Sequence, residues 1–332
     1  MNKRILFICG LISLIHACNL PANASTPTPD LLATLSASTP LSASTEAPVP
    51  STFFPSNEPT GRIVFTCQIY KDQTSEQICT MNADGSDYRR LTNDEDIRHS
   101  YPSFSPDGES VVHSAFNKQS KHYEIYEMDL STNENKALTY AIGDLNAPEI
   151  SPDGKTIAFT RFFNDPDKPN TWLMDRNGTN LRQVSGVAAW DPTWSPDGEQ
   201  ILFASYINDL SQLFIINLDG TGLRQVSDLP DLRGRSDWSP QNLIVTYSGK
   251  PWKREIFVMN VDGTALRQIS PSGGNSQGPS FSPDGQWLAF TSYFDKYGDI
   301  DGCEIYIMQV DGTDLRRLTD NDNCDYQPRW GP

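Results

Sequence analysis

The chain has 332 residues, of which 37% are hydrophobic, and a formal net charge of −16 at pH 7. This anionic balance is the opposite of what a protein needs to hold nucleic-acid phosphates, so nucleic-acid binding is excluded as the function. The length exceeds the usual size of one domain, but all-β propellers grow by repetition around one axis, so a single repetitive domain is compatible with it.

Residues 1–18 have the features of an export signal. Two basic residues precede an apolar run over residues 5–15, which is too short for a permanent membrane-spanning helix. The run leads into Ile-His-Ala-Cys, which resembles a bacterial lipobox ending at Cys18. We therefore predict lipidation of Cys18 and attachment to a membrane through this lipid. Ordinary signal-peptidase cleavage after Ala24, in Ala-Asn-Ala, is the alternative.

Residues 19–60 are predicted to form a disordered linker. Ser, Thr, Pro and Ala dominate this segment, and no aromatic residue occurs in it before Phe53. Such a composition buries too little apolar surface to offset the entropy of ordering. The prolines would stiffen the linker and hold a folded body away from the membrane.

From residue 61 onward one phrase of the form Pro-x-aromatic-Ser-Pro-Asp-Gly recurs. Close copies begin at Pro102, Pro148, Pro192 and Pro279, a degenerate copy begins at Ser236, and a truncated copy begins at Pro328. The serines of the first five copies, at positions 105, 151, 195, 239 and 282, are 46, 44, 44 and 43 residues apart. A period of this length is typical of the four-stranded blades of a propeller.

Each phrase predicts a tight turn between two strands, with Pro and Gly at favourable turn positions. A short apolar strand such as Trp287–Thr291 follows, and after a polar loop comes a third strand such as Glu304–Met308. The third strand mostly ends in an Asp-Gly hairpin such as Val261–Thr264, and a fourth strand such as Leu315–Thr319 completes the unit. No segment has helical periodicity of useful length.

The fourth type of strand occurs six times, because Asp87–Thr92 precedes the first full phrase. The blade that begins near Gly61 lacks an opening phrase, and Pro328–Trp330 can supply its innermost strand. We therefore predict an all-β fold over residues 61–332. It is a six-bladed β-propeller of four-stranded antiparallel blades, closed when the C-terminal strand joins the first blade, which leaves no open sheet edge at the seam.

Four cysteines follow the signal, namely Cys67, Cys79, Cys303 and Cys324. An even number in an exported chain predicts disulfides, and four cysteines allow three pairings. We favour Cys67 with Cys79 and Cys303 with Cys324, because the members of each pair are close in sequence. A zinc site is the rival interpretation, but no C-x-x-C spacing occurs.

The phrase at residues 192–198, with Ile-Tyr-x-Met at 305–308 and Asp-Gly-Thr-x-Leu-Arg-x-Leu-Thr at 311–319, resembles the WD40-like PD40 repeat of the TolB propeller family. The similarity covers residues 61–332. It implies a propeller that engages proteins or peptides at the mouth of its channel, as TolB does in the Tol-Pal envelope system. The family's N-terminal α/β domain has no counterpart here, so a Tol-Pal role is not expected.

Propellers usually bind ligands where the outer strand of one blade connects to the inner strand of the next. We expect these connections to form a ring of aromatic, amide and charged groups suited to a peptide or a glycan. The candidate ligand-binding residues are His99, Tyr101, Asn146, Trp190, Asp191, Arg235, Asp237, Asn275, Gln277, Tyr326 and Gln327.

The sequence offers no credible catalytic constellation. Residues 274–278 match the G-x-S-x-G of serine hydrolases, but no histidine follows His122 and no helix is expected after the motif. The acidic loops at 295–301 and 320–323 could bind calcium, although neither has calcium-loop spacing. We expect no other cofactor and no other metal.

The predicted function is therefore non-enzymatic. We expect a monomeric binding or scaffolding propeller, anchored in the cell envelope and facing the periplasm or the cell exterior, that binds an envelope protein, a peptide or a glycan. The alternative is a carbohydrate-active enzyme, such as a polysaccharide lyase or a hydrolase, or a sensor on the same fold. Such a lyase would use a metal and a histidine cluster, and only His99, His113 and His122 follow the signal.

Overall fold

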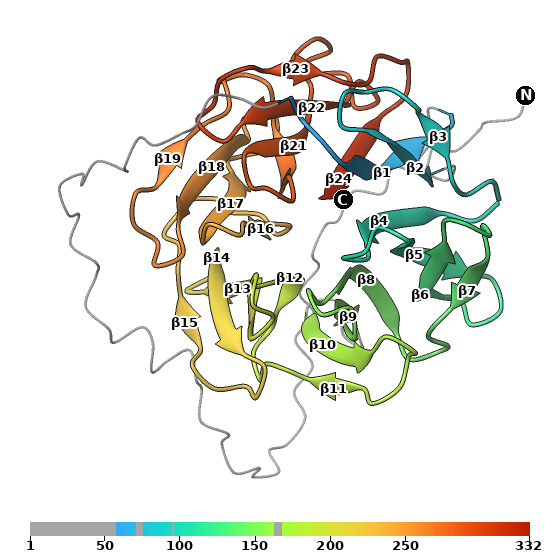
Figure 1. Cartoon of the computed structure of the whole chain (residues 1–332). Helices are drawn as coiled ribbons and strands as arrows, with labels where there is room; N and C mark the ends of the chain where they lie inside the picture. Colours follow the sequence, from blue (N-terminus) through green and yellow to red (C-terminus); the bar gives the residue numbers. More distant parts are fainter. Residues whose placement is uncertain (1–57, 71–75, 95, 163–167) are drawn as a thin grey trace, which may run out of the picture. The chain divides into compact units, whose positions relative to one another are not determined.

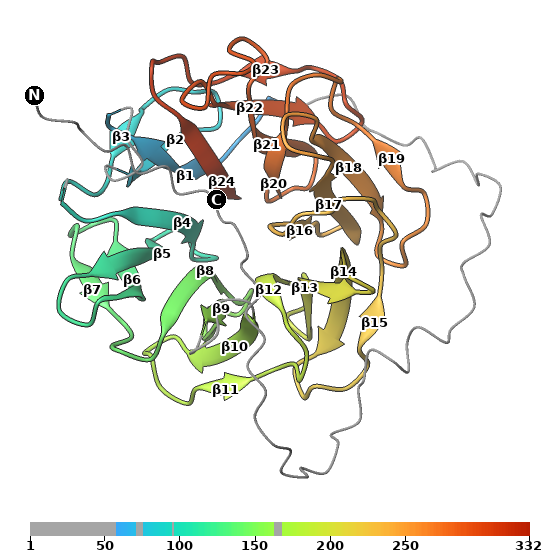
Figure 2. The same ribbon diagram turned by 180° about the vertical axis from the view of Figure 1, so that it is seen from behind.

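The structure is a computed structural model that describes residues 58–70, 76–94, 96–162 and 168–332. These residues form 24 strands in six four-stranded antiparallel sheets, which surround a common axis as the blades of a propeller (Figure 1). Figure 2 shows the same ring from behind. The predicted signal, Cys18 and most of the predicted linker lie outside the described residues. Within the described ranges, no helix has the length and apolar character needed to cross a bilayer.

In every blade the strands follow the chain outward from the axis, except that the last strand of the chain is the innermost strand of blade 1. Blades 1 to 3, from the innermost strand outward, are β24 (Asp325–Gly331), β1 (Arg62–Gln68), β2 (Glu76–Asn82) and β3 (Arg89–Arg90); β4 (His99–Phe104), β5 (Ser110–Asn117), β6 (His122–Asp129) and β7 (Asn135–Ala137); β8 (Asp144–Ile150), β9 (Thr156–Phe162), β10 (Asn170–Asp175) and β11 (Arg182–Gln183). Blades 4 to 6 are β12 (Trp190–Trp194), β13 (Gln200–Ile207), β14 (Leu210–Asn217) and β15 (Arg224–Gln225); β16 (Asp237–Trp238), β17 (Leu243–Ser248), β18 (Glu255–Asn260) and β19 (Arg267–Gln268); β20 (Gln277–Phe281), β21 (Trp287–Ser292), β22 (Glu304–Gln309) and β23 (Arg316–Arg317).

The recurring Ser-Pro-Asp-Gly phrase forms the turn between the first two strands of a blade, as predicted. In blade 2 the amide of Gly108 donates to the carbonyl of Ser105 at 2.9 Å, and the Ser105 hydroxyl donates to the Asp107 carboxylate at 2.5 Å. Gly108 has a φ of 69°, a left-handed conformation that glycine adopts without a steric penalty. Blades 3, 4 and 6 repeat these bonds, so one tetrapeptide fixes the register of four blades.

A second repeated arrangement of hydrogen bonds holds the short fourth strand of a blade against the third strand. In blade 6 the amide of Ile305 donates to the Thr319 hydroxyl at 2.9 Å, and that hydroxyl donates to the Glu304 carboxylate at 2.6 Å. Thr139 with Glu124, Ser227 with Gln212, and Ser270 with Glu255 make the same arrangement. These bonds explain why Glu124, Gln212 and Glu304 occupy buried positions near the start of their third strands.

The hydrophobic core lies between neighbouring blades. At the seam between blades 6 and 1, Trp287 and Ile307 pack with Ile63 and Phe65, and Trp330 joins the same cluster. All of these side chains are buried. The seam that closes the ring is therefore packed like the interior of the protein, not left as a polar contact.

The ring closes as predicted, through pairing of β24 with β1. Arg62 is opposite Gly331, and Ile63 is opposite Trp330, whose indole also donates to the carbonyl of Thr60 at 2.8 Å. Both predicted disulfides are confirmed. Cys67–Cys79 joins β1 to β2, and Cys303–Cys324 joins blade 6 to the segment that leads into β24.

The side chain of Arg329, in the closing strand β24, makes contacts at the centre of the ring. Its guanidinium donates to the Glu149 carboxylate of blade 3 at 2.6 Å and to the carbonyls of Ser236 and Pro279, each at 3.2 Å. These partners belong to the segment that leads into blade 5 and to blade 6, so one side chain from blade 1 connects four blades. Burial raises the pKa of Glu149, and the Arg329 charge opposes that effect.

We predict that Arg329→Met destabilises the protein by about 3–5 kcal/mol, because Glu149 would remain buried without its cation. The double variant Arg329→Met/Glu149→Leu should recover most of this loss, since a buried ion pair is often replaceable by apolar groups. Equilibrium unfolding in urea measures both effects. A single variant as stable as the wild type would contradict the role given to Arg329.

Candidate functional site

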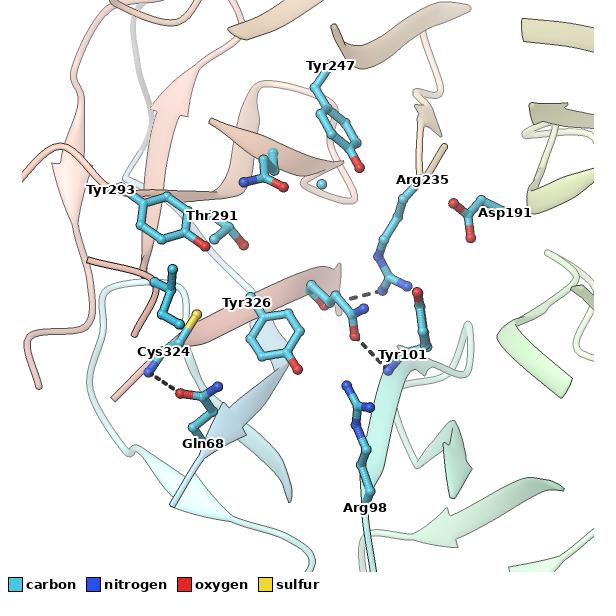
Figure 3. Close-up of a pocket in the computed structure, with 14 residues that line it drawn as sticks. Gln68, Arg98, Tyr101, Asp191, Arg235, Tyr247, Thr291, Tyr293, Cys324 and Tyr326 are labelled. Carbon is cyan, nitrogen blue, oxygen red and sulfur yellow. Dashed lines mark hydrogen bonds between the residues drawn. The ribbon is translucent and has the colours of Figure 1, made fainter. Parts of the chain in front are cut away.

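A cavity of about 290 Å³ opens at the mouth of the central channel (Figure 3). It lies on the face where outer strands connect to the inner strands of the following blades, opposite the Ser-Pro-Asp-Gly turns. We call it the mouth cavity, and its lining residues are Gln68, Arg98, Tyr101, Asp191, Arg235, Tyr247, Gln277, Gly278, Thr291, Tyr293, Ile300, Cys324, Tyr326 and Gln327.

A repeated irregularity of the innermost strands builds this mouth. In each blade one residue just before the phrase has a left-handed backbone, with φ between 48° and 57°, and in five blades the strand pairing shifts register around it. Such bulges re-aim side chains. The six bulge residues, which recur at the blade period, are Tyr101, Ala147, Asp191, Arg235, Gly278 and Gln327. All of them except Ala147 line the mouth cavity.

Arg235 lies across the top of the channel. Its guanidinium donates at 3.3 Å to the carbonyls of Pro102 and Gln327, and it stacks on the Tyr101 ring with 5.2 Å to the centroid. Burial lowers the pKa of Arg235 to about 10, and the nearby Arg329 charge acts in the same direction. The guanidinium remains protonated at neutral pH.

The Asp191 carboxylate balances part of this charge. Burial raises the pKa of Asp191, and Arg235 is the largest opposing influence. A methyl group at Gly234 would lie 1.9 Å from the Asp191 carboxylate, so glycine is required where the segment leading into blade 5 passes this group. The close contact between the backbone at Gly234 and the Asp191 carboxylate keeps Asp191 beside Arg235, which follows Gly234 in the chain, at the mouth.

Arg98 forms the opposite wall of the mouth cavity. It makes two hydrogen bonds to the carboxylate of Glu76, which is fully buried, with 2.8 Å for the longer one. Burial raises the pKa of Tyr326, and the Glu76 charge adds to that effect, so its phenol stays protonated beside this ion pair. Arg98 therefore brings no uncompensated charge.

Two arginines on the blade 5 side do have uncompensated charge. No described carboxylate forms an ion pair with Arg233 or Arg254 within 4.0 Å, and the Arg254 side chain donates to the Gln277 amide oxygen. Both lie close enough to Tyr247 to affect its phenol electrostatically. Burial raises the pKa of Tyr247 to about 12, Asp191 adds to the rise, and the charges of Arg254, Arg233 and Arg235 oppose it.

Several buried polar atoms around the mouth have no hydrogen-bond partner. Two of these atoms, the Thr291 hydroxyl and the Nε of Arg235, belong to residues that line the mouth cavity. The other two, the Nε of Arg254 and the amide oxygen of Asn275, belong to residues that contact the lining residue Gln277. Buried polar groups are normally satisfied, so these groups are candidates for hydrogen bonds to a polar ligand. Figure 3 shows the Thr291 hydroxyl and the Tyr247 phenol directed toward the interior of the cavity.

A second hollow of about 400 Å³ adjoins the mouth cavity and shares Tyr101 and Asp191 with it. Its lining includes three aromatic side chains, Phe162, Trp190 and Tyr206, which we call the aromatic shelf. The rings of Trp190 and Tyr206 are 4.6 Å apart, and Tyr206 is about half exposed. Such a shelf can hold a flat apolar surface of a ligand.

The structure brings eight of the eleven predicted site residues to these two hollows. Tyr101, Asp191, Arg235, Gln277, Tyr326 and Gln327 line the mouth cavity, and Asn146 and Trp190 line the hollow with the aromatic shelf.

The other three predicted site residues line neither hollow. His99 is buried inside blade 2 against His113, with ring centroids 5.2 Å apart, and burial lowers the pKa of His99 to about 3. Asn275 is also buried. Asp237 accepts hydrogen bonds from the Ser280 hydroxyl and the Phe281 amide, so it ties blade 5 to blade 6.

Residues that reach the mouth from the second strands were not predicted from the sequence. Gln68, Tyr247 and Thr291 lie at or near the ends of β1, β17 and β21, where these strands arrive at the mouth face. Their position at the end of the apolar run that follows each phrase was a usable signal. Nothing in the repeat pattern marks Arg98, Arg254 or Ile300.

The described residues contain no group of three or more His, Cys, Asp or Glu side chains arranged to hold a metal. The acidic loops considered for calcium are bridged by basic side chains of the chain itself. Lys296 lies 3.7 Å from the Glu304 carboxylate and 3.8 Å from that of Asp322, and Arg317 contacts Asp320 at 2.6 Å.

The fold and the mouth define a class of protein, the closed six-bladed β-propeller with a polar cavity at one end of its channel. More particularly, residues 165–332 match the PD40 family, the TolB beta propeller domain, and the chain belongs to that family.

Known proteins resemble the chain over different lengths. An uncharacterized protein of Agrobacterium fabrum is 26% identical over 157 residues, which are 43% of this chain and 52% of that protein. The Tol-Pal system protein TolB of Anaeromyxobacter dehalogenans is 26% identical over 162 residues, 48% of this chain and 36% of that protein. The chain thus matches about half the length of these relatives or less. The crystal structure of TolB from Acinetobacter baumannii superposes with a TM-score of 0.71 at 20% identity, covering 83% of this chain and 68% of that one.

One buried acid next to the mouth gives the protein a specific pH dependence. Asp325 is 1% exposed, accepts a hydrogen bond from the Asn321 amide at 2.8 Å, and has a second carboxylate oxygen without a partner. Burial raises the pKa of Asp325 from 3.8 to about 7, and the Glu304 charge adds to the rise. Between these two pH values the unfolded chain releases a proton that the folded chain keeps.

We therefore predict that Asp325 makes the protein less stable as the pH rises from about 4 to about 7, by up to about 1.4 kcal/mol per pH unit, with no further loss above that range. Asp325→Asn should be more stable than the wild type at pH 8 and should lose this advantage toward pH 4. Thermal unfolding over this pH series measures the difference. Asp322→Asn, which changes a carboxylate that is 93% exposed, is the matched control, and the same pH profile in both variants would contradict the assignment.

Proposed function

We propose that the protein is a non-enzymatic binding propeller that holds its ligand at the mouth cavity and on the adjoining aromatic shelf. The observation that carries this proposal is the group of unsatisfied buried polar atoms around the cavity, including the Thr291 hydroxyl and the Nε of Arg235. Residues held in left-handed backbone conformations at the same place support it, because such strain often accompanies ligand sites. The ligand is an envelope protein, a peptide or a glycan.

A carbohydrate-active enzyme is the competing proposal, and the described histidines give it little support. His99 and His113 are buried inside blade 2, and burial lowers the pKa of each, to about 3 and about 4. His122 lies 3.3 Å from Asp144, and neither residue lines either hollow. Among the residues that the structure describes, Asp191 is the one carboxylate that lines the mouth cavity. General acid–base chemistry of the glycosidase type needs a pair.

The envelope location belongs to the same proposal. Two disulfides in a chain with an export-type N-terminus support an oxidising compartment, such as the periplasm or the cell exterior. A lipid on Cys18 would hold the monomeric propeller at a membrane through the linker, with the mouth free to meet a ligand.

We predict that Trp190→Ala and Gln277→Ala, combined in the full-length protein, reduce ligand capture at least tenfold, because central aromatic contacts typically contribute about 2 kcal/mol or more. Capture is measured against an envelope extract and a glycan panel, with the immobilised wild-type protein in parallel. Both side chains are partly exposed, but Trp190 also packs against a core cluster, so thermal unfolding of the variant must show that it remains folded.

The matched control is Leu181→Ala/Leu266→Ala, which removes two exposed apolar side chains next to the hairpins between the third and fourth strands, on the opposite face of the ring. This variant should capture the same ligands as the wild type. If the mouth variant captures normally while the control does not, the binding face proposed here is wrong.

We also predict that Cys18→Ser releases the protein from the membrane into the soluble extracytoplasmic fraction, because a lipid on this residue would be the anchor. Fractionation combined with labelling by a radioactive fatty acid measures both the location and the modification. A variant that remains membrane-bound to the same degree would refute the anchor.

A further inference from the structure

We propose that the ligand is an acidic oligosaccharide, bound with a sugar ring on the aromatic shelf and the carboxylate of a uronic acid in the mouth cavity. This inference rests on the proposed function and names the ligand's chemistry. Three properties of the mouth support it, namely its charge, its hydroxyl and amide lining, and the backbone of its innermost strands.

The charge at the mouth is positive although the chain as a whole has a net charge of −16. Four arginines lie in or beside the mouth cavity, which are Arg98, Arg233, Arg235 and Arg254. Glu76 forms an ion pair with Arg98, and Asp191 interacts electrostatically with Arg235 without forming an ion pair within 4.0 Å, whereas no described carboxylate pairs with Arg233 or Arg254. Two positive charges therefore remain around Tyr247, and a ligand carboxylate would neutralise one of them.

The rest of the lining suits a polyhydroxylated ligand. Gln68, Gln277 and Gln327 present amides, and Thr291 and four tyrosines present hydroxyls. Asp191 lies where both hollows meet and can accept hydrogen bonds from sugar hydroxyls. The tilted pair of Trp190 and Tyr206 offers an apolar surface of the kind on which the C–H face of a sugar ring packs.

The innermost strands are poorly suited to an extended peptide. Peptides often bind by adding a strand to a sheet edge and using its backbone amides. In five blades a proline directly follows the bulge residue and removes an amide donor at the mouth, namely Pro102, Pro148, Pro192, Pro279 and Pro328. The bulges also interrupt the ladder at the same positions, so recognition falls to side chains.

The experiment is an NMR titration of the full-length protein with D-glucuronate, and with D-glucose as the neutral counterpart, in which a hydroxymethyl group replaces the carboxylate. Glucuronate should shift the backbone signals of Gln277 and Thr291 and the indole signal of Trp190, and bind about tenfold more tightly than glucose, as one charge-assisted contact would give. Equal affinity for the two sugars, or no saturable shift at these residues, would overturn the proposal.

Two further arms separate the alternatives. The double variant Arg233→Gln/Arg254→Gln should weaken glucuronate binding at least about fivefold and leave glucose binding unchanged, since it removes charge without touching the aromatic shelf. An acetylated Ala-Glu-Phe peptide that binds the mouth more tightly than glucuronate would replace the sugar with an acidic peptide and overturn the inference. The capture experiment with the Trp190 and Gln277 variant is independent of these sugars, so the binding function could survive a failure here.

Discussion

The guanidinium of Arg329 is the interaction on which the ring depends. Backbone carbonyls at the innermost strands of the six sheets face the axis, and buried carbonyls must find hydrogen-bond donors. Arg329 donates to two of these carbonyls and to the Glu149 carboxylate. Because it is carried by the last strand of the chain, the step that closes the ring also supplies the axis with its donor.

Toward the mouth, every blade has one residue with a left-handed backbone in or just before its innermost strand, and the identity of this residue differs from blade to blade. The bulge position holds Tyr101, Ala147, Asp191, Arg235, Gly278 and Gln327 in turn. The strained backbone is tolerated because the following phrase and its turn bonds hold each innermost strand from the other end. The repeat thus preserves the framework and leaves the site free to vary, which is why membership of a propeller family does not define a ligand.

The sequence was sufficient for the fold because its strongest signals are local. The spacing of the Ser-Pro-Asp-Gly phrases gave the blade count, and the truncated phrase at Pro328–Trp330 gave the closure, which β24 and β1 confirm. The cysteine pairs followed from proximity in the chain.

The candidate site could be predicted only in part, because side chains from different blades converge on it. The connections between blades identified Trp190 and Arg235, but alternation along the strand turned His99 into the blade interior. Arg254 belongs to the candidate site because it interacts with Tyr247 and donates a hydrogen bond to Gln277. No short-range pattern in the sequence indicates such contacts between segments that are distant along the chain.

Within the described residues, Arg235 and Arg329 extend from their own blades across the axis and donate hydrogen bonds to carbonyls of other blades. A ligand therefore meets side chains and not a tunnel, and its affinity depends on local contacts. The net charge of −16 would repel an acidic ligand at long range, but at physiological ionic strength charges are screened over about 8 Å. Arg233 and Arg254 lie within such a distance of Tyr247 at the mouth, so the overall negative charge does not conflict with the proposal of an acidic ligand there.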